Sequence, residues 1–132
     1  MAIDDPYAQY RENQLTTVTP GKTLVMAYDA AIRFARTASE RMKEGKLDEQ
    51  SANIRKAQNI IVEFMSTLDM RHDRRLAANL YGIYSYMFDR LTQASIRDDA
   101  GALSEAITML TELRDTWAEA ERLVRSGERA AA

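Results

Sequence analysis

The sequence predicts an all-α fold, an antiparallel up-down-up-down four-helix bundle with a short N-terminal helical segment. Glycine and proline are scarce, with five and two residues in 132, so long helices can run without interruption. Apolar residues recur every three or four positions in four successive segments, and no segment alternates as a strand does. The links between the segments are short, which forces consecutive long helices to lie antiparallel.

The first two segments are expected to begin and end at recognisable residues. Thr19 and Pro20 supply a hydroxyl N-cap and a proline at the first helical position, and Gly45 is a typical C-terminal glycine. Asp48 is expected to cap the second segment. The second stripe is wide enough to touch two neighbouring helices. The stripes are Leu24, Tyr28, Ala31, Ala35, Ala38 and Met42, and then Ile54, Ala57, Ile60, Ile61, Phe64, Met65 and Leu68.

The last two segments begin at acidic residues. The third starts near Asp73, and the fourth follows Asp98 and Asp99, whose charge suits a helix N-terminus. Gly127 is expected to end the fourth helix. We therefore divide the chain into residues 1–18, a bundle over residues 19–126 and a disordered tail over residues 127–132. The two stripes are Leu76, Leu80, Tyr84, Met87, Leu91 and Ala94, and then Leu103, Ala106, Leu110, Leu113, Trp117, Ala120 and Val124.

Residues 1–18 lie outside the four-helix pattern. Ile3, Tyr7 and Tyr10 share one face of a short helix that would begin at Asp5 and Pro6. A helix of this length is marginal in water and forms only where its aromatic face can dock. Two interpretations stay open: a movable capping segment, or a fifth element packed permanently on the bundle.

Composition restricts the function. The net charge is −2, and basic and acidic residues number nine and nine in residues 1–66 and nine and eleven in residues 67–132. Neither half carries the basic excess that a nucleic-acid partner requires. No apolar run approaches the roughly 20 residues that span a bilayer, and the N-terminus lacks a signal sequence. We therefore expect a cytoplasmic protein without membrane insertion.

Catalysis and metal binding lack the residues they need. The chain has no cysteine and a single histidine, His72, so histidine- or cysteine-based zinc, di-iron and nucleophile–base sites cannot be assembled. The five glycines are scattered and form no phosphate-binding loop. We expect no enzyme activity and no cofactor. A histidine phosphotransfer domain is the one alternative in this class, but His72 lies at a predicted helix junction within a charged run.

Tyrosine and methionine are unusually frequent for a self-contained bundle. Of six tyrosines, five fall into two clusters, and six methionines are internal. Both residue types are common where a protein grips another chain. At helical spacing they are also ordinary core residues, and this alternative stays open. The tyrosine clusters are Tyr7 and Tyr10, and then Tyr81, Tyr84 and Tyr86.

A series of short motifs runs in order along most of the chain. They are Tyr7-Ala-Gln-Tyr10, Thr19-Pro20-Gly21-Lys22, Leu24-Val-Met-Ala-Tyr28-Asp29, Ile54-Arg-Lys56-Ala57-Gln58-Asn-Ile60-Ile61, Ser66-Thr-Leu68-Asp69, Ala78-Asn79-Leu80-Tyr81, Tyr84-Ser-Tyr86-Met87 and Leu113-Arg114-Asp115-Thr116-Trp117. In this order they resemble the FliS family of flagellar secretion chaperones. Three positions depart from the family pattern: Ala30 and Ser95 replace a glycine and an asparagine, and the corner after Asp69 is rich in arginine.

The resemblance implies a cytoplasmic chaperone that binds the C-terminal region of flagellin, prevents premature polymerisation and delivers it to the type III export apparatus and its gate protein. The free protein would be a monomer or weak homodimer, and the complex a heterodimer. A self-associating structural bundle is the alternative. We expect the N-terminal tyrosines to cover part of a client surface formed by outward-facing apolar residues. The expected partner-binding residues are Tyr7, Tyr10, Tyr28, Ile54, Ala57, Ile61, Leu80, Tyr84, Met87 and Leu91.

Overall fold

The computed structural model describes residues 20–131, with side chains for residues 21–127, and over this range it consists of four helices without a strand. The predicted segment 1–18, including Tyr7, Tyr10 and the proposed cap at Thr19, lies outside the described residues. The helices are α2 (Pro20–Lys43), α3 (Leu47–Ser66), α4 (Arg74–Arg97) and α5 (Ala100–Ala131).

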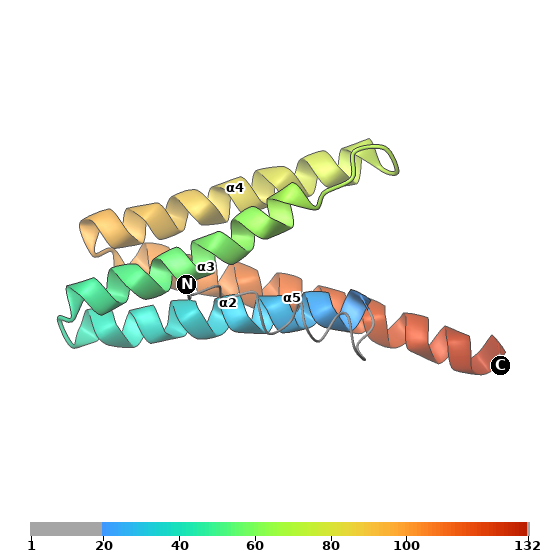
Figure 1. The fold of residues 1–132 in the computed structure, drawn as a ribbon, viewed down its shortest axis with the longest axis horizontal. Helices are drawn as coiled ribbons and strands as arrows, with labels where there is room; N and C mark the ends of the chain where they lie inside the picture. The colour runs from blue at the N-terminus through green and yellow to red at the C-terminus, as the bar shows by residue number, and fades with distance from the viewer. Residues whose placement is uncertain (1–19, 132) are drawn as a thin grey trace, which may run out of the picture.

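Consecutive helices run in opposite directions, so the described chain is an up-down-up-down bundle (Figure 1). Helix α2 packs against α3 and α5, and α4 packs against the same two helices, whereas the backbones of the diagonal pairs stay apart. This closed ring of neighbours is the arrangement that short links between long helices favour. The predicted all-helical fold is confirmed.

Local sequence signals set several of the helix ends. Gly45 has a φ of +72° after the end of α2, and Lys46 N–H donates to the Arg41 carbonyl at 2.9 Å, as in a Schellman motif. The Asp73 carboxylate caps α4 by accepting from the Leu76 N–H at 3.0 Å. Asp99 caps α5 in the same way, through the Ala102 N–H at 3.0 Å. Each signal satisfies a backbone group that the helix itself leaves unpaired.

Two predicted helix ends are wrong. Lys46 occupies the N-cap position of α3 without a side-chain cap, and Asp48 lies in the first helical turn. Helix α5 does not end at Gly127 but continues to Ala131. An isolated glycine costs about 1 kcal/mol inside a helix, and this cost does not terminate a long helix that is already formed. Ion pairs from Glu119 to Arg122 and from Glu121 to Arg125 strengthen the preceding turns.

The core is built around an alanine-rich face of α2. Small side chains let α3 and α5 approach α2 closely, and larger aliphatic residues from the other helices fill the interior. Tyr28 and Ile32 are larger buried residues of α2, and Tyr28 is fully buried. The buried alanines of α2 are Ala27, Ala30, Ala31, Ala35 and Ala38.

The bundle is closed at one end and splayed at the other. At the end that carries the α3–α4 turn, the α3–α4 hairpin leans away from α2 and α5 (Figure 1). At the opposite end, Gln50 donates to the Asp98 carboxylate at 3.0 Å and joins the start of α3 to the end of α4. Helix α5 also projects beyond the other helices, and residues 122–127 are exposed. We call the two ends the closed end and the splayed end.

Candidate functional site

Every predicted partner-binding residue within the described range is a core residue. None has more than 9% of its surface exposed. The expectation that they face outward is therefore wrong, because α3 and α4 each lie between two neighbours, which cover even a wide apolar face. Surface available to a partner must come from other residues. The buried residues are Tyr28, Ile54, Ala57, Ile61, Leu80, Tyr84, Met87 and Leu91.

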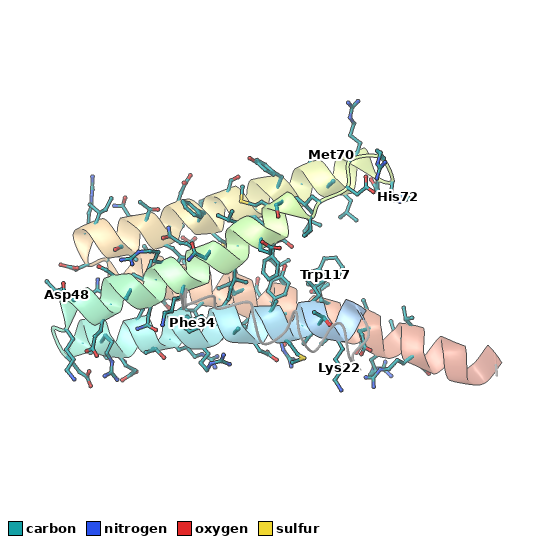
Figure 2. The ribbon with its side chains drawn as sticks, in the orientation of Figure 1. Lys22, Phe34, Asp48, Met70, His72 and Trp117 are labelled. Carbon is teal, nitrogen blue, oxygen red and sulfur yellow. The ribbon has the colours of Figure 1, made fainter. Side chains whose placement is uncertain are left out.

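An aromatic cluster joins all four helices toward the splayed end. The rings of Tyr28 and Phe64 stack with centroids 4.4 Å apart, and Phe64 meets Tyr84 at 5.6 Å. The hydroxyls of Tyr28 and Tyr84 share a hydrogen bond of 2.6 Å, and the Trp117 indole N–H donates to the Tyr28 oxygen at 3.2 Å. Figure 2 shows Trp117 beside the space between the diverging helices.

The two hydroxyls of this cluster stay protonated well above neutral pH. Burial raises the pKa of Tyr28 far above its ordinary value, and the hydrogen bond with Tyr84 raises it further. Burial also raises the pKa of Tyr84. The cluster therefore acts as a neutral hydrogen-bonded contact and not as an acid or base near pH 7.

Half-buried apolar side chains surround the aromatic cluster. Leu24 of α2, Leu113 and Trp117 of α5, and Leu68 after α3 pack on the core but remain partly open to solvent. Leu76 at the start of α4 is exposed over half of its surface. At this end of the bundle, some apolar side-chain surface therefore stays exposed to solvent after the helices have packed.

A shallow apolar hollow lies between α3 and α4. We call it the α3–α4 groove, and it has a volume of about 250 Å³. Tyr81, one helical turn before Ser85, is half exposed on the same side of α4. Toward the closed end, the Gln58 amide crosses to the Thr92 hydroxyl at 2.8 Å and the Phe88 carbonyl at 3.1 Å. The groove is lined by Val62, Met65, Ser85, Phe88 and Asp89.

No residue of the α3–α4 groove is among the partner-binding residues predicted from the sequence. Met65 widens the apolar stripe of α3 and Phe88 lies beside that of α4, whereas Val62 belongs to neither stripe. The useful signal was the second, narrower row at helical spacing, Gln58, Val62 and Met65 on α3 and Tyr81, Ser85 and Phe88 on α4. Residues of such a flanking row lie at the rim of a helix pair, where a third helix can reach them.

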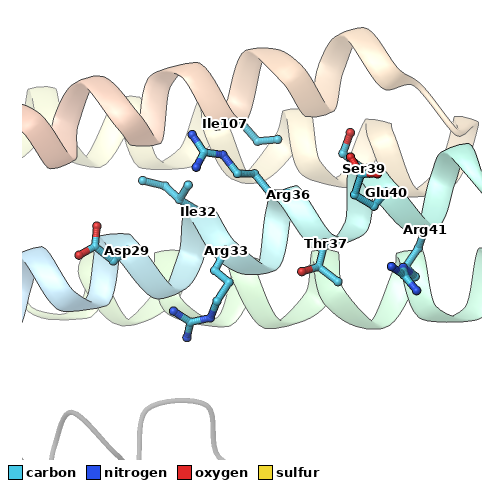
Figure 3. A pocket seen from close by; sticks show the side chains of 9 residues that line it. All are labelled: Asp29, Ile32, Arg33, Arg36, Thr37, Ser39, Glu40, Arg41 and Ile107. Atoms are coloured by element: carbon cyan, nitrogen blue, oxygen red, sulfur yellow. The ribbon is translucent and has the colours of Figure 1, made fainter.

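A second, larger hollow runs along α2 and has a volume of about 530 Å³ (Figure 3). Its apolar floor includes Ile32 and Ile107, with Arg36 lying near Ile107 in Figure 3. The rest of its lining is polar, with arginine, acidic and hydroxyl side chains, so it does not present a continuous apolar surface. Asp29 at one end is paired with Arg114 of α5 at 2.8 Å.

The described residues contain no group of three acidic, histidine or cysteine side chains that could hold a metal ion. His72 is exposed in the α3–α4 turn, where its Nε2 lies 3.6 Å from an Asp69 carboxylate oxygen. This turn position agrees with the helix junction predicted for His72. No helix of the described residues is long and apolar enough to cross a membrane.

The geometry therefore defines a helical bundle that exposes apolar surface at one hairpin and one end, a class typical of proteins that bind other polypeptide chains. The family model of flagellar protein FliS matches residues 3–124. The chain belongs to the FliS family of flagellar secretion chaperones, which is a chaperone family and not an enzyme family.

Individual relatives agree with this assignment. The chain is 38% identical to the flagellar secretion chaperone FliS of Bacillus subtilis, over 91% of this chain and 89% of the relative. It is 30% identical to the Escherichia coli chaperone of the same name, over 86% and 85%. The fold is similar to a crystal structure of a bacterial flagellar chaperone, with a TM-score of 0.73 at 20% identity over 88% of this chain and 94% of that one.

Proposed function

We propose that this chaperone works in the cytoplasm, where it binds the C-terminal region of flagellin and prevents its premature polymerisation. It then delivers the flagellin to the flagellar type III export apparatus, where a gate protein receives the complex. Family membership supports this role. The observation that carries it is the α3–α4 groove, an apolar surface that the bundle's own packing leaves uncovered.

The α3–α4 groove suits one face of an amphipathic helix. Val62 and Met65 on one side and Phe88 on the other offer apolar contacts about one helical turn apart. A flagellin segment that orders only on binding loses conformational entropy, so it needs more surface than this groove provides. The half-buried apolar residues of the splayed end, including Leu113 and Trp117, supply the additional area in this proposal.

The partner-binding residues predicted from the sequence have two roles in this function. Tyr28, Tyr84 and the other buried candidates shape the helix pair on which the client rests. Tyr7 and Tyr10 cover part of the client surface when flagellin is absent. The free chaperone is a monomer or weak homodimer, and the complex is a heterodimer of one chaperone and one flagellin.

The test compares two exposed apolar residues on the same hairpin. Val62→Asp places a charge in the α3–α4 groove, whereas Ile96→Asp places the same charge on a 75% exposed residue of α4 that lines neither hollow. By calorimetry with a flagellin C-terminal fragment, Val62→Asp should weaken binding at least about tenfold. Ile96→Asp should leave the affinity within about twofold of wild type, a change of no more than about 0.4 kcal/mol.

Equal affinities of the two variants for the flagellin fragment would show that the groove is not part of the binding site. Sedimentation tests the main alternative, a self-associating structural bundle, because the chaperone should form a one-to-one complex when mixed with the fragment. A homodimer that persists unchanged in the mixture would favour the alternative. Phosphate labelling through His72 is not expected, since the proposed function requires no enzyme activity.

A further inference from the structure

The turn between α3 and α4, together with the first turn of α4, forms a projecting tip at the splayed end. We define the tip as residues 69–76. Met70 and Leu76 expose 47% and 50% of their surfaces, and the Arg71 side chain is almost fully exposed. Figure 2 shows Met70 and His72 at this outermost point of the hairpin. Two apolar side chains are thus presented to solvent beside a cluster of arginines.

The acidic residues of the tip are already engaged. Asp69 accepts from the Arg71 guanidinium at 3.1 and 3.4 Å, and Asp73 accepts the Leu76 N–H that begins α4. Arg74 and Arg75 are exposed, and neither forms an ion pair with any side chain of the described residues 21–127. Two unpaired positive charges therefore stand at the end of the hairpin.

The position of these two arginines works against helix stability. They occupy the first turn of α4, where the helix macrodipole is positive and acidic residues are favoured. Helix α3 follows the usual preference, with Asp48 and Glu49 in its first turn. A local arrangement that folding does not favour is a sign of a functional surface. The charges at Arg74 and Arg75 therefore point to a negatively charged partner.

The shape of the tip indicates what kind of anionic partner fits. The tip is the convex end of a hairpin (Figure 1), and neither hollow described above includes a tip residue. A cluster of arginines can also bind an acidic peptide, but that kind of recognition makes no use of the exposed Met70 and Leu76 beside the arginines. A bilayer needs only a projecting surface with basic side chains that reach the headgroups and apolar ones that enter the interface.

We propose that the tip is a peripheral docking surface for bilayers that contain anionic phospholipids. Arg74 and Arg75 contact the headgroup phosphates, and Met70 and Leu76 enter the interfacial region. Because secretion crosses a membrane, the contact concentrates the chaperone where its cargo leaves the cell. Few charges take part, so the binding is weak and is lost at high ionic strength.

The experiment is vesicle flotation with the full chain at low ionic strength. Vesicles of phosphatidylcholine that contain about one-third phosphatidylglycerol, a content rich enough in anionic lipid to attract basic side chains, are compared with vesicles of phosphatidylcholine alone. The wild-type chain should float with the anionic vesicles only. The double variant Arg74→Gln/Arg75→Gln should lower the partition coefficient about thirtyfold, the factor expected for removing two basic residues near an anionic surface.

A matched variant separates the tip from the charge of the whole chain. Arg36→Gln/Arg97→Gln removes two exposed arginines elsewhere on the bundle, so its net charge equals that of the tip variant. Its partition should remain within about twofold of wild type. An equal loss in both variants would overturn the proposal, as would equal binding of the wild type to both kinds of vesicle.

A third outcome identifies a different partner. If the wild type ignores anionic vesicles but is retained by immobilised polyglutamate through Arg74 and Arg75, the tip binds an acidic protein and the bilayer proposal is wrong. Circular dichroism should confirm that the variants are folded. Because the tip does not line the α3–α4 groove, both variants should still bind the flagellin fragment.

Discussion

The hydrogen bond between Tyr28 and Tyr84 should couple the stabilities of α2 and α4. Both side chains are buried, at 0% and 3% exposure, and their hydroxyls are 2.6 Å apart. Tyr84→Phe leaves the Tyr28 hydroxyl with only the Trp117 N–H, and Tyr28→Phe removes the 2.6 Å partner of the Tyr84 hydroxyl and leaves it only the Trp117 indole. A buried polar group that loses its partner costs about 1–3 kcal/mol, so each single variant should lose that much free energy of unfolding.

The double variant Tyr28→Phe/Tyr84→Phe shows whether the two hydroxyls stabilise the fold as a pair or independently of each other. Replacing both hydroxyls leaves no orphaned hydroxyl, so the combined loss should be smaller than the sum of the single losses by about 1–2 kcal/mol. Urea unfolding measures these values through circular dichroism and through Trp117, the only tryptophan of the chain. Tyr86→Phe is the control, because Tyr86 is half exposed and bonds Glu105 at the surface.

The control should change the free energy of unfolding by less than about 0.5 kcal/mol. Losses that add within error in the Tyr28/Tyr84 double variant would refute the reasoning, because the two hydroxyls would then not act as a pair. Wild-type stability in both single variants would refute it equally. In that case, water would replace the lost hydrogen bond in each variant without any change in the free energy of unfolding.

Three further measurements test other parts of the structure. Alkaline pH should destabilise the fold: unfolded tyrosines ionise above their ordinary pKa of 10.0, whereas the raised pKa values of Tyr28 and Tyr84 keep them protonated in the folded state. Stability is thus full below about pH 10 and falls above it, and the slope measured by urea unfolding should be shallower in the Tyr28→Phe/Tyr84→Phe variant. Gln50→Leu should be neutral or stabilising by up to about 1 kcal/mol in thermal unfolding, because the buried Gln50 carbonyl oxygen has no partner and Asp98 is exposed to water. A loss above about 2 kcal/mol would show that the Gln50–Asp98 bond itself stabilises the closed end. Deleting residues 1–18 should preserve helical content and cooperative melting while changing flagellin affinity, and an unfolded truncated chain would contradict the capping role.

Helix existence and most helix ends followed from the sequence because they depend on local chemistry. Asp73 caps α4 and Gly45 follows α2 as their residue types predict, since each signal acts within one turn. The helix end predicted at Gly127 was wrong because one glycine does not stop a long helix that is already formed. The ion pairs that precede it, from Glu119 and Glu121, favour continuation.

The division between core and surface could not be predicted from the same stripes. Ile61 and Val62 are adjacent and both apolar, yet the first is fully buried and the second is 48% exposed. Periodicity gives the direction of an apolar face, but it does not give how much of that face the neighbouring helices cover. The α2 alanines decide this, because they let α3 approach until its central stripe is sealed.

The close approach of the helices at the closed end has a consequence for how the molecule opens. Toward that end Gln58 crosses from α3 to α4, whereas the helices diverge toward the tip. Amide hydrogen exchange should therefore be graded along α3 and α4, slowest in the closed half and fastest near the turn. Such a gradient lets one end rearrange around an incoming chain while the other preserves the fold, so capture and release need not involve global unfolding.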